Sequence, residues 1–227
     1  MKLYPLAFAA ALLPLFTIHL CYVLAANSGH VDWCIPYIDS CTSISATGRK
    51  PPAFFVFKGL MIPAAVILLM YWYCSCYWLA SLGCAARLQH RIILSITVVA
   101  CLGLILYSVM LGAIGDIYQL QRRIGVTTFF GLSYIGQLLV THRLSTLDTI
   151  TRYHQRELTL LKSVSLVIML IGIASIVFQA VDDDYYDTKE DAFEWTFTLL
   201  LCTHVLISAV LWKKTGFMHT FASAQKT

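Results

Sequence analysis

Six long apolar stretches dominate this sequence and limit what it can fold into. A helix needs about 20 mostly apolar residues to cross the hydrocarbon core of a bilayer. The stretches span residues 5–26, 54–82, 92–113, 125–141, 161–181 and 195–212. The fourth is the weakest, because Gly131, Gly136 and Gln137 dilute it, but glycine is better tolerated in membrane helices than in soluble ones. The sequence therefore predicts an all-α, polytopic membrane protein, a six-transmembrane-helix bundle.

The composition agrees with a chain whose outer surface faces lipid. Hydrophobic residues make up 59% of the sequence and charged residues 12%, whereas a soluble domain carries roughly 25% charged residues. Very little sequence remains outside the apolar stretches. We therefore expect one integral membrane domain over residues 1–227. The net charge of +4 is spread between short connections, which argues against a nucleic-acid partner.

The positive residues divide unequally between the two sets of connections. One set holds ten: Lys2, Arg87, Arg91, Arg143, Arg152, Arg156, Lys162, Lys213, Lys214 and Lys226. The other holds six: Arg49, Lys50, Lys58, Arg122, Arg123 and Lys189. The richer set is expected on the cytoplasmic side, which predicts that both termini are cytoplasmic. The plasma membrane is the favoured location.

The first apolar stretch has an alternative interpretation as a cleaved signal peptide. Lys2, an apolar run and the small residues of "LAAN" resemble the three regions of such a peptide. The run is longer than a usual signal-peptide core, and it contains Pro14, His19 and Cys21. We therefore favour a retained helix; cleavage would leave five helices and place the N-terminus outside.

The first predicted extracytoplasmic loop, residues 27–52, is the longest connection in the chain. Loops of this length are usually functional or disordered, and the aromatic and proline residues of "HVDWCIPYIDSC" argue for order. Cys34 and Cys41 flank a short segment with Pro36, so a disulfide is expected on this side of the membrane. The other cysteines show no metal-binding spacing, and we expect no metal and no cofactor.

The loop ends in the stretch "SISATGRKPP", residues 43–52, which has specific turn chemistry. Gly48 is expected to supply a positive φ for the turn. Pro51 and Pro52 suit the first turn of a helix. Two further connections are expected: an outer loop over residues 112–125, and a cytoplasmic segment over residues 142–162. The latter is either a basic amphipathic helix or an extension of the neighbouring spans.

This layout resembles the Frag1/DRAM/Sfk1 family, which is related to the N-terminal region of Cwh43 and to PGAP-type factors that remodel GPI anchors. The family carries a signature of the form "ISxTGxxPPxxxVF" before its second helix, and "ISATGRKPPAFFVF" matches it here. The matching residues are Ile44, Ser45, Thr47, Gly48, Pro51, Pro52, Val56 and Phe57. One departure is Arg123, which stands where the family often has histidine before its fourth helix, so a histidine-dependent proton role does not carry over.

The resemblance implies a lipid-related function without one shared reaction. Some relatives take part in GPI-lipid remodelling, some in phosphoinositide signalling or lipid asymmetry, and others in lysosomal autophagy. We therefore expect a protein that binds, organises or supports remodelling of lipids at the extracytoplasmic interface. Membrane lipids are the expected partners, with a membrane-protein partner as an alternative, and the oligomeric state is left open.

A headgroup site would need cations at the outer interface. Arg49, Arg122 and Arg123 are candidates there, because guanidinium groups bind phosphate in a bidentate manner. Lys58 either extends to the outer interface or turns inward to join them, with Asp116 as a counter-charge.

Two other functional classes stay open. The first is an outer-face lipid-modifying enzyme of the acyl-transfer type, for which His30 and Asp32 are weak catalytic candidates. The second is a transporter of ions or small solutes, against which stand the lack of an inverted repeat and the few polar residues in mid-helix. His19 and His204 could meet across the bundle, but separate interhelical hydrogen bonds are the favoured explanation for both.

Overall fold

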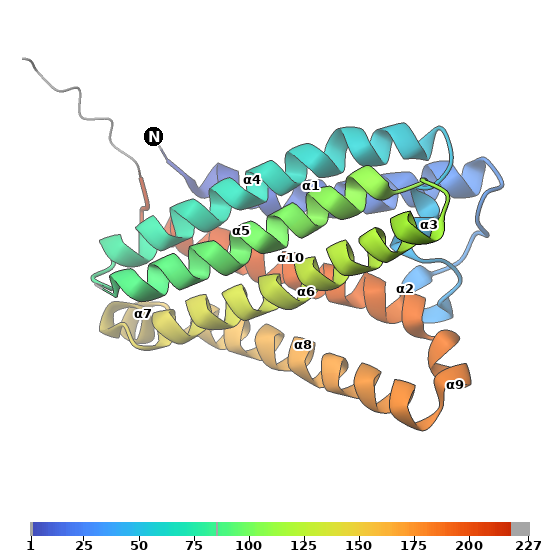
Figure 1. Cartoon of the computed structure of the whole chain (residues 1–227). Coiled ribbons are helices and arrows are strands. Elements are labelled where there is room, and N and C mark those ends of the chain that lie inside the picture. Colours follow the sequence, from blue (N-terminus) through green and yellow to red (C-terminus); the bar gives the residue numbers. More distant parts are fainter. Residues whose placement is uncertain (1, 85, 219–227) are drawn as a thin grey trace, which may run out of the picture.

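The computed structural model describes residues 2–84 and 86–218, and six long helices account for most of them (Figure 1). These are α1 (Tyr4–Asn27), α4 (Ala53–Ser81), α5 (Arg87–Met110), α6 (Asp116–Ser145), α8 (Gln155–Val181) and α10 (Glu190–Lys214). Four short helices lie in the connections: α2 (Pro36–Asp39), α3 (Ile44–Thr47), α7 (Asp148–Tyr153) and α9 (Asp183–Asp187). Each long helix is long and apolar enough to cross a membrane. The prediction of an all-α, six-helix, multi-pass membrane protein is confirmed.

The fourth span differs most from its predicted bounds. Residues 116–124 were expected in a loop, yet they form the first turns of α6, and the connection that remains covers only residues 111–115. Because these residues are polar, the sequence pattern did not predict this part of the helix. An apolar stretch marks only the part of a helix that lies in hydrocarbon. Asp116 in the first turn suits a helix N-terminus, where the backbone dipole favours negative charge.

The segment 142–162 continues the neighbouring spans. Helix α6 extends to Ser145 and α8 begins at Gln155, so only residues 146–154, with the six-residue helix α7, lie between them. Of the two interpretations offered above, extension of the spans describes this region better than one independent amphipathic helix.

The long helices form a bundle with a consistent order of neighbours. Helix α4 packs against α1 and α5, α5 packs against α6, and α10 packs against α1 and α8. Helices α5 and α6 cross most closely where Gly103 faces Gly125. A Cβ on Gly125 would lie 2.7 Å from the Gly103 carbonyl oxygen, and a Cβ on Gly103 would lie 2.8 Å from that of Gly125. Small residues permit such close approach between membrane helices.

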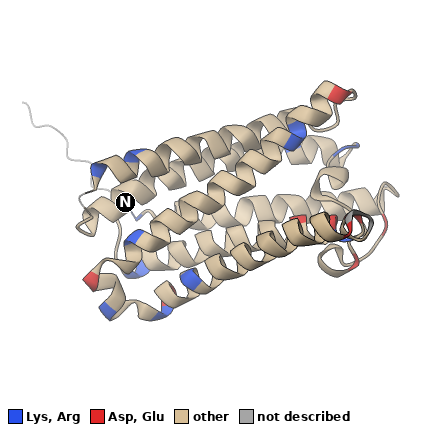
Figure 2. Cartoon of the chain, turned by 60° about the horizontal axis from the view of Figure 1, so that its bottom comes forward, with Lys and Arg blue, Asp and Glu red and all other residues tan. Residues whose placement is uncertain are grey.

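The bundle has two distinct ends. At the loop end lie residues 28–52 with α2 and α3, the 111–115 connection and α9; at the termini end lie Lys2, Met218 and α7 (Figure 1). Lys2 and Met218 form an antiparallel bridge, and Lys214 pairs with Glu157 at 2.5 Å. Figure 2 shows most Lys and Arg residues near the termini end and most acidic residues near the loop end.

The first loop is folded against the bundle. The predicted disulfide between Cys34 and Cys41 is present. Tyr22 of α1 holds this region, because its hydroxyl donates to the Cys34 carbonyl at 2.8 Å and accepts from the Cys34 N–H at 2.7 Å. On α10, the Trp195 Nε1–H donates to the Thr42 carbonyl at 2.8 Å. Burial raises the pKa of Tyr37, and its hydroxyl donates to His19 Nε2 at 2.9 Å.

Candidate functional site

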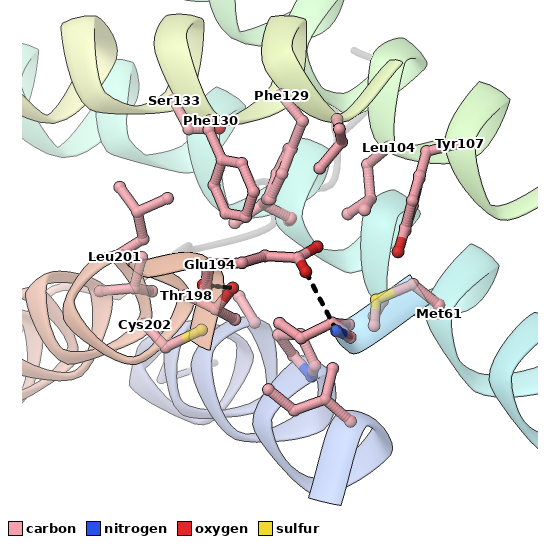
Figure 3. Close-up of a pocket in the computed structure, with 18 of the residues that line it drawn as sticks. Met61, Leu104, Tyr107, Phe129, Phe130, Ser133, Glu194, Thr198, Leu201 and Cys202 are labelled. Atoms are coloured by element: carbon pink, nitrogen blue, oxygen red, sulfur yellow. Dashed lines mark hydrogen bonds between the residues drawn. The ribbon is translucent and has the colours of Figure 1, made fainter. Parts of the chain in front are cut away.

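A narrow apolar cavity, which we call the slot, lies in the middle of the bundle (Figure 3). Its volume is about 60 Å³, and residues of α1, α4, α5, α6 and α10 form its walls. Ile44, Phe57 and Glu194 line it toward the loop end, and Trp72 and Gln137 line it farther toward the termini end. The slot therefore extends from the loop end into the interior of the bundle.

The walls of the slot carry hydrogen-bonding groups that the described residues leave unpaired. These are Trp72 Nε1, the Tyr107 hydroxyl, Ser133 Oγ and Gln137 Oε1. Gln137 is held in place from its other side, where Nε2–H donates to the Leu201 carbonyl at 2.9 Å. Buried polar atoms almost always have partners, and polar groups at membrane depth are functional candidates. The slot thus has an apolar surface, but the residues of its walls carry buried hydrogen-bonding atoms without partners among the described residues.

A larger polar hollow, which we call the vestibule, lies at the loop end of the slot. Its volume is about 580 Å³, and α3, α6, α8 and α10 contribute to its walls. Tyr107, Val126, Phe130 and Glu194 line both hollows, so the vestibule and the slot adjoin along these residues. A polar hollow continuous with an apolar one is complementary to an amphipathic molecule.

The vestibule brings together three of the five residues that the sequence predicted for a headgroup site. Arg49, Arg122 and Arg123 all line it. Arg122 is occupied structurally, because Nη1–H donates to the Ala113 carbonyl at 2.8 Å beyond the end of α5. Arg49 donates to Ser45 Oγ at 2.7 Å. Arg123 is exposed, and its side chain forms no hydrogen bond or ion pair with the part of the chain that the structure describes.

The structure places the other two predicted residues elsewhere. The Lys58 ammonium donates to the Val109 carbonyl at 2.9 Å and lies 4.1 Å from the centroid of the Phe54 ring. Asp116 is exposed at the start of α6. Neither residue lines the vestibule, so Lys58 does not converge with the arginines and Asp116 is not their counter-charge.

Three carboxylates that line the vestibule were expected on the outer side but were not among the predicted site residues: Glu190, Asp191 and Glu194. All three belong to the first turns of α10. The half-buried Glu194 carboxylate accepts from the Ile44 N–H at 3.0 Å, which ties the start of α3 to α10 (Figure 3). Their position directly before the sixth apolar stretch was the available signal, since acidic residues there face the same interface as the predicted cations.

The signature segment closes the loop end of the slot. Ser43 caps α3 by accepting from the Ala46 N–H at 3.0 Å, and Ile44, Thr47 and Phe57 are buried. Ser45 faces the vestibule, Val56 packs beside the core, and Pro51 and Pro52 directly precede α4. The segment therefore has a structural role at the mouth of the candidate site.

The expected positive φ at Gly48 is wrong, because its φ is −101°. Glycine is required there for space instead. A Cβ on Gly48 would lie 2.7 Å from Leu111 Cδ2 and 2.8 Å from Phe57 Cδ2. Both neighbours are fully buried, so the absence of a side chain lets α3 lie close against α4 and the end of α5.

His30, His19 and His204 form separate hydrogen bonds with different partners. His30 and Asp32 line the same shallow hollow, but His30 Nε2–H donates to the Pro51 carbonyl at 3.0 Å. Within residues 2–84 and 86–218, no carboxylate is hydrogen-bonded to His30. His19 and His204 do not meet either: His19 bonds to Tyr37, and buried His204 bonds across helices to Thr141 at 2.8 Å. The expectation of separate hydrogen bonds is confirmed.

Comparison with protein families matches residues 2–213, nearly the whole chain, to the Frag1/DRAM/Sfk1/Cwh43P N-terminal domain. No curated protein and no solved structure matches the chain significantly.

Proposed function

Because the chain belongs to the Frag1/DRAM/Sfk1/Cwh43P N-terminal domain family, we propose that it binds and organises membrane lipids, or supports their remodelling, at the loop end of the bundle. In this proposal the loop end faces the extracytoplasmic side of the plasma membrane and both termini lie in the cytoplasm. The unequal division of Lys and Arg between the two ends supports this orientation.

The observation that carries the proposal is the junction of the vestibule and the slot. A phospholipid has a charged headgroup joined to apolar chains, and the two hollows offer a charged wall directly beside an apolar one. The slot, at about 60 Å³, suits part of one acyl chain, while the remaining lipid lies against the apolar outer surface of the bundle. Helix α8 borders the vestibule through Ser175, and few of its residues are buried inside the bundle.

Arg123 is the residue we assign to the headgroup phosphate. Its guanidinium has no partner among the described residues, and charge-assisted hydrogen bonds from arginine to phosphate are strong and geometrically specific. Arg49, which also lines the vestibule, adds a second cation with donors left free beyond its bond to Ser45.

Native mass spectrometry of the gently purified protein, combined with lipid analysis, tests this function. We expect a phospholipid retained in about one-to-one ratio, with retention weakened roughly tenfold in Arg123→Ala, the loss of one or two charged hydrogen bonds. Lys50→Ala is the matched control, because Lys50 is an exposed cation at the same end that does not line the vestibule. Absence of retained lipid, or equal loss in the two variants, would contradict the proposal.

A further inference from the structure

The vestibule holds equal numbers of basic and acidic side chains, and no ion pair joins them in the described part of the chain. Three arginines and three carboxylates line it: Arg49, Arg122, Arg123, Glu190, Asp191 and Glu194. Ion pairing in the described part of the chain is confined to Lys214 and Glu157, at the opposite end of the bundle. Unlike charges that share one hollow normally attract each other into pairs, so this arrangement holds both signs available for a ligand.

The two signs occupy separate elements. The cations come from Arg49, which follows α3, and from the first turns of α6, whereas the carboxylates come from the first turns of α10. Glu194 is already bonded to the Ile44 N–H, and Arg122 to the Ala113 carbonyl. The groups that remain free to contact a bound molecule are Arg49, Arg123, Glu190 and Asp191.

Aromatic rings from α9 and α10 also line the vestibule, close in sequence to the carboxylates. Tyr186 and Phe193 line the hollow with their rings stacked at a centroid distance of 6.0 Å. The Tyr186 hydroxyl is fixed by a hydrogen bond with Ser175 Oγ at 2.9 Å. An ammonium group is stabilised beside carboxylates by Coulomb attraction and beside aromatic faces by cation–π contact.

From this arrangement we propose that the vestibule selects zwitterionic phospholipids, those with an ethanolamine or choline headgroup, over anionic ones. The phosphate binds Arg123 and Arg49, and the ammonium binds Glu190 and Asp191 beside Tyr186 and Phe193. An anionic headgroup without an ammonium leaves the two carboxylates facing a negative charge, which opposes binding. This inference rests on the proposed lipid binding and adds the headgroup class.

The test uses the full chain in nanodiscs that contain equal amounts of phosphatidylethanolamine, phosphatidylcholine and phosphatidylglycerol. The lipid that remains bound after transfer to detergent is identified by native mass spectrometry. We expect ethanolamine and choline lipids to exceed phosphatidylglycerol about tenfold, the scale of one charge-assisted contact. In the double variant Glu190→Gln and Asp191→Asn we expect this preference to disappear, because retention of the ethanolamine and choline lipids falls while that of phosphatidylglycerol does not.

Asp116→Asn is the matched control, because it removes an exposed carboxylate at the same end, outside the vestibule. It should leave the headgroup preference unchanged. Wild-type protein that retains phosphatidylglycerol as well as zwitterionic lipids, or a preference that the double variant leaves intact, would overturn this inference while leaving lipid binding standing. Loss of every lipid class from the wild type would instead reject the proposed function itself.

Discussion

Glu194 shows how one residue outside the predicted set can organise the site. Its carboxylate lies between the vestibule and the slot and accepts from the Ile44 N–H at the start of the signature helix α3. Sequence alone identified the signature and its cations, but it could not supply this partner, because the two residues lie 150 positions apart. The same limit applies to Tyr107 and Gln137, whose place beside the slot depends on how the helices rotate against each other.

Two replacements of Glu194 distinguish the effect of its hydrogen bond from the effect of its charge. Glu194→Gln keeps an oxygen acceptor for the Ile44 N–H, whereas Glu194→Leu leaves that buried N–H without a partner, at a cost of about 1–3 kcal/mol in the free energy of unfolding. We expect faster amide hydrogen exchange over α3 in the Leu variant and near-normal exchange in the Gln variant. Equal exchange in both variants would show that the bond does not hold α3 in place.

At the scale of the helices, the core of each span was predictable and the ends were not. Apolar stretches mark hydrocarbon-facing residues, so they located six helices, yet the polar first turns of α6 were assigned to a loop. Those turns carry Arg122 and Arg123. One wall of the vestibule is thus a helix that extends beyond the apolar stretch, which explains why the sequence placed these cations at the outer interface but assigned them to a loop.

The close crossing of α5 and α6 should be sensitive to any side chain added at Gly125. In Gly125→Ala the new methyl group would lie 2.7 Å from the Gly103 carbonyl oxygen, which is backbone and cannot rotate away. The helices must separate, and we expect a loss of about 1–3 kcal/mol in stability. Thermal unfolding in detergent measures it.

Gly131→Ala is the control on the same helix, because a Cβ there has no neighbour within 4 Å. Alanine favours helix over glycine by up to about 1 kcal/mol, so this variant should unfold at the same temperature as the wild type or slightly higher. A Gly125 variant that is as stable as the Gly131 variant would mean that the close crossing is not required.

At the scale of the whole molecule, the arrangement of the two ends follows from the sequence almost entirely. Six crossings return the chain to the end where it began, and the Lys2–Met218 bridge and the Lys214–Glu157 pair lie together there. The disulfide, the vestibule and the acidic residues gather at the other end. The vestibule itself could not be predicted from the sequence, because a hollow is created by three-dimensional packing between segments that are distant in the chain.

The orientation of the bundle in the membrane can be tested with exposed lysines at its two ends. Lys50 is exposed at the loop end, whereas Lys162 and Lys213 are exposed near the termini end. With the positively charged end in the cytoplasm, an amine reagent that cannot cross membranes should modify Lys50 in intact cells, and Lys162 and Lys213 only after permeabilisation. Peptide mass spectrometry identifies the modified lysines. Modification of Lys213 but not Lys50 in intact cells would reverse the orientation, and the vestibule would then face cytoplasmic lipids.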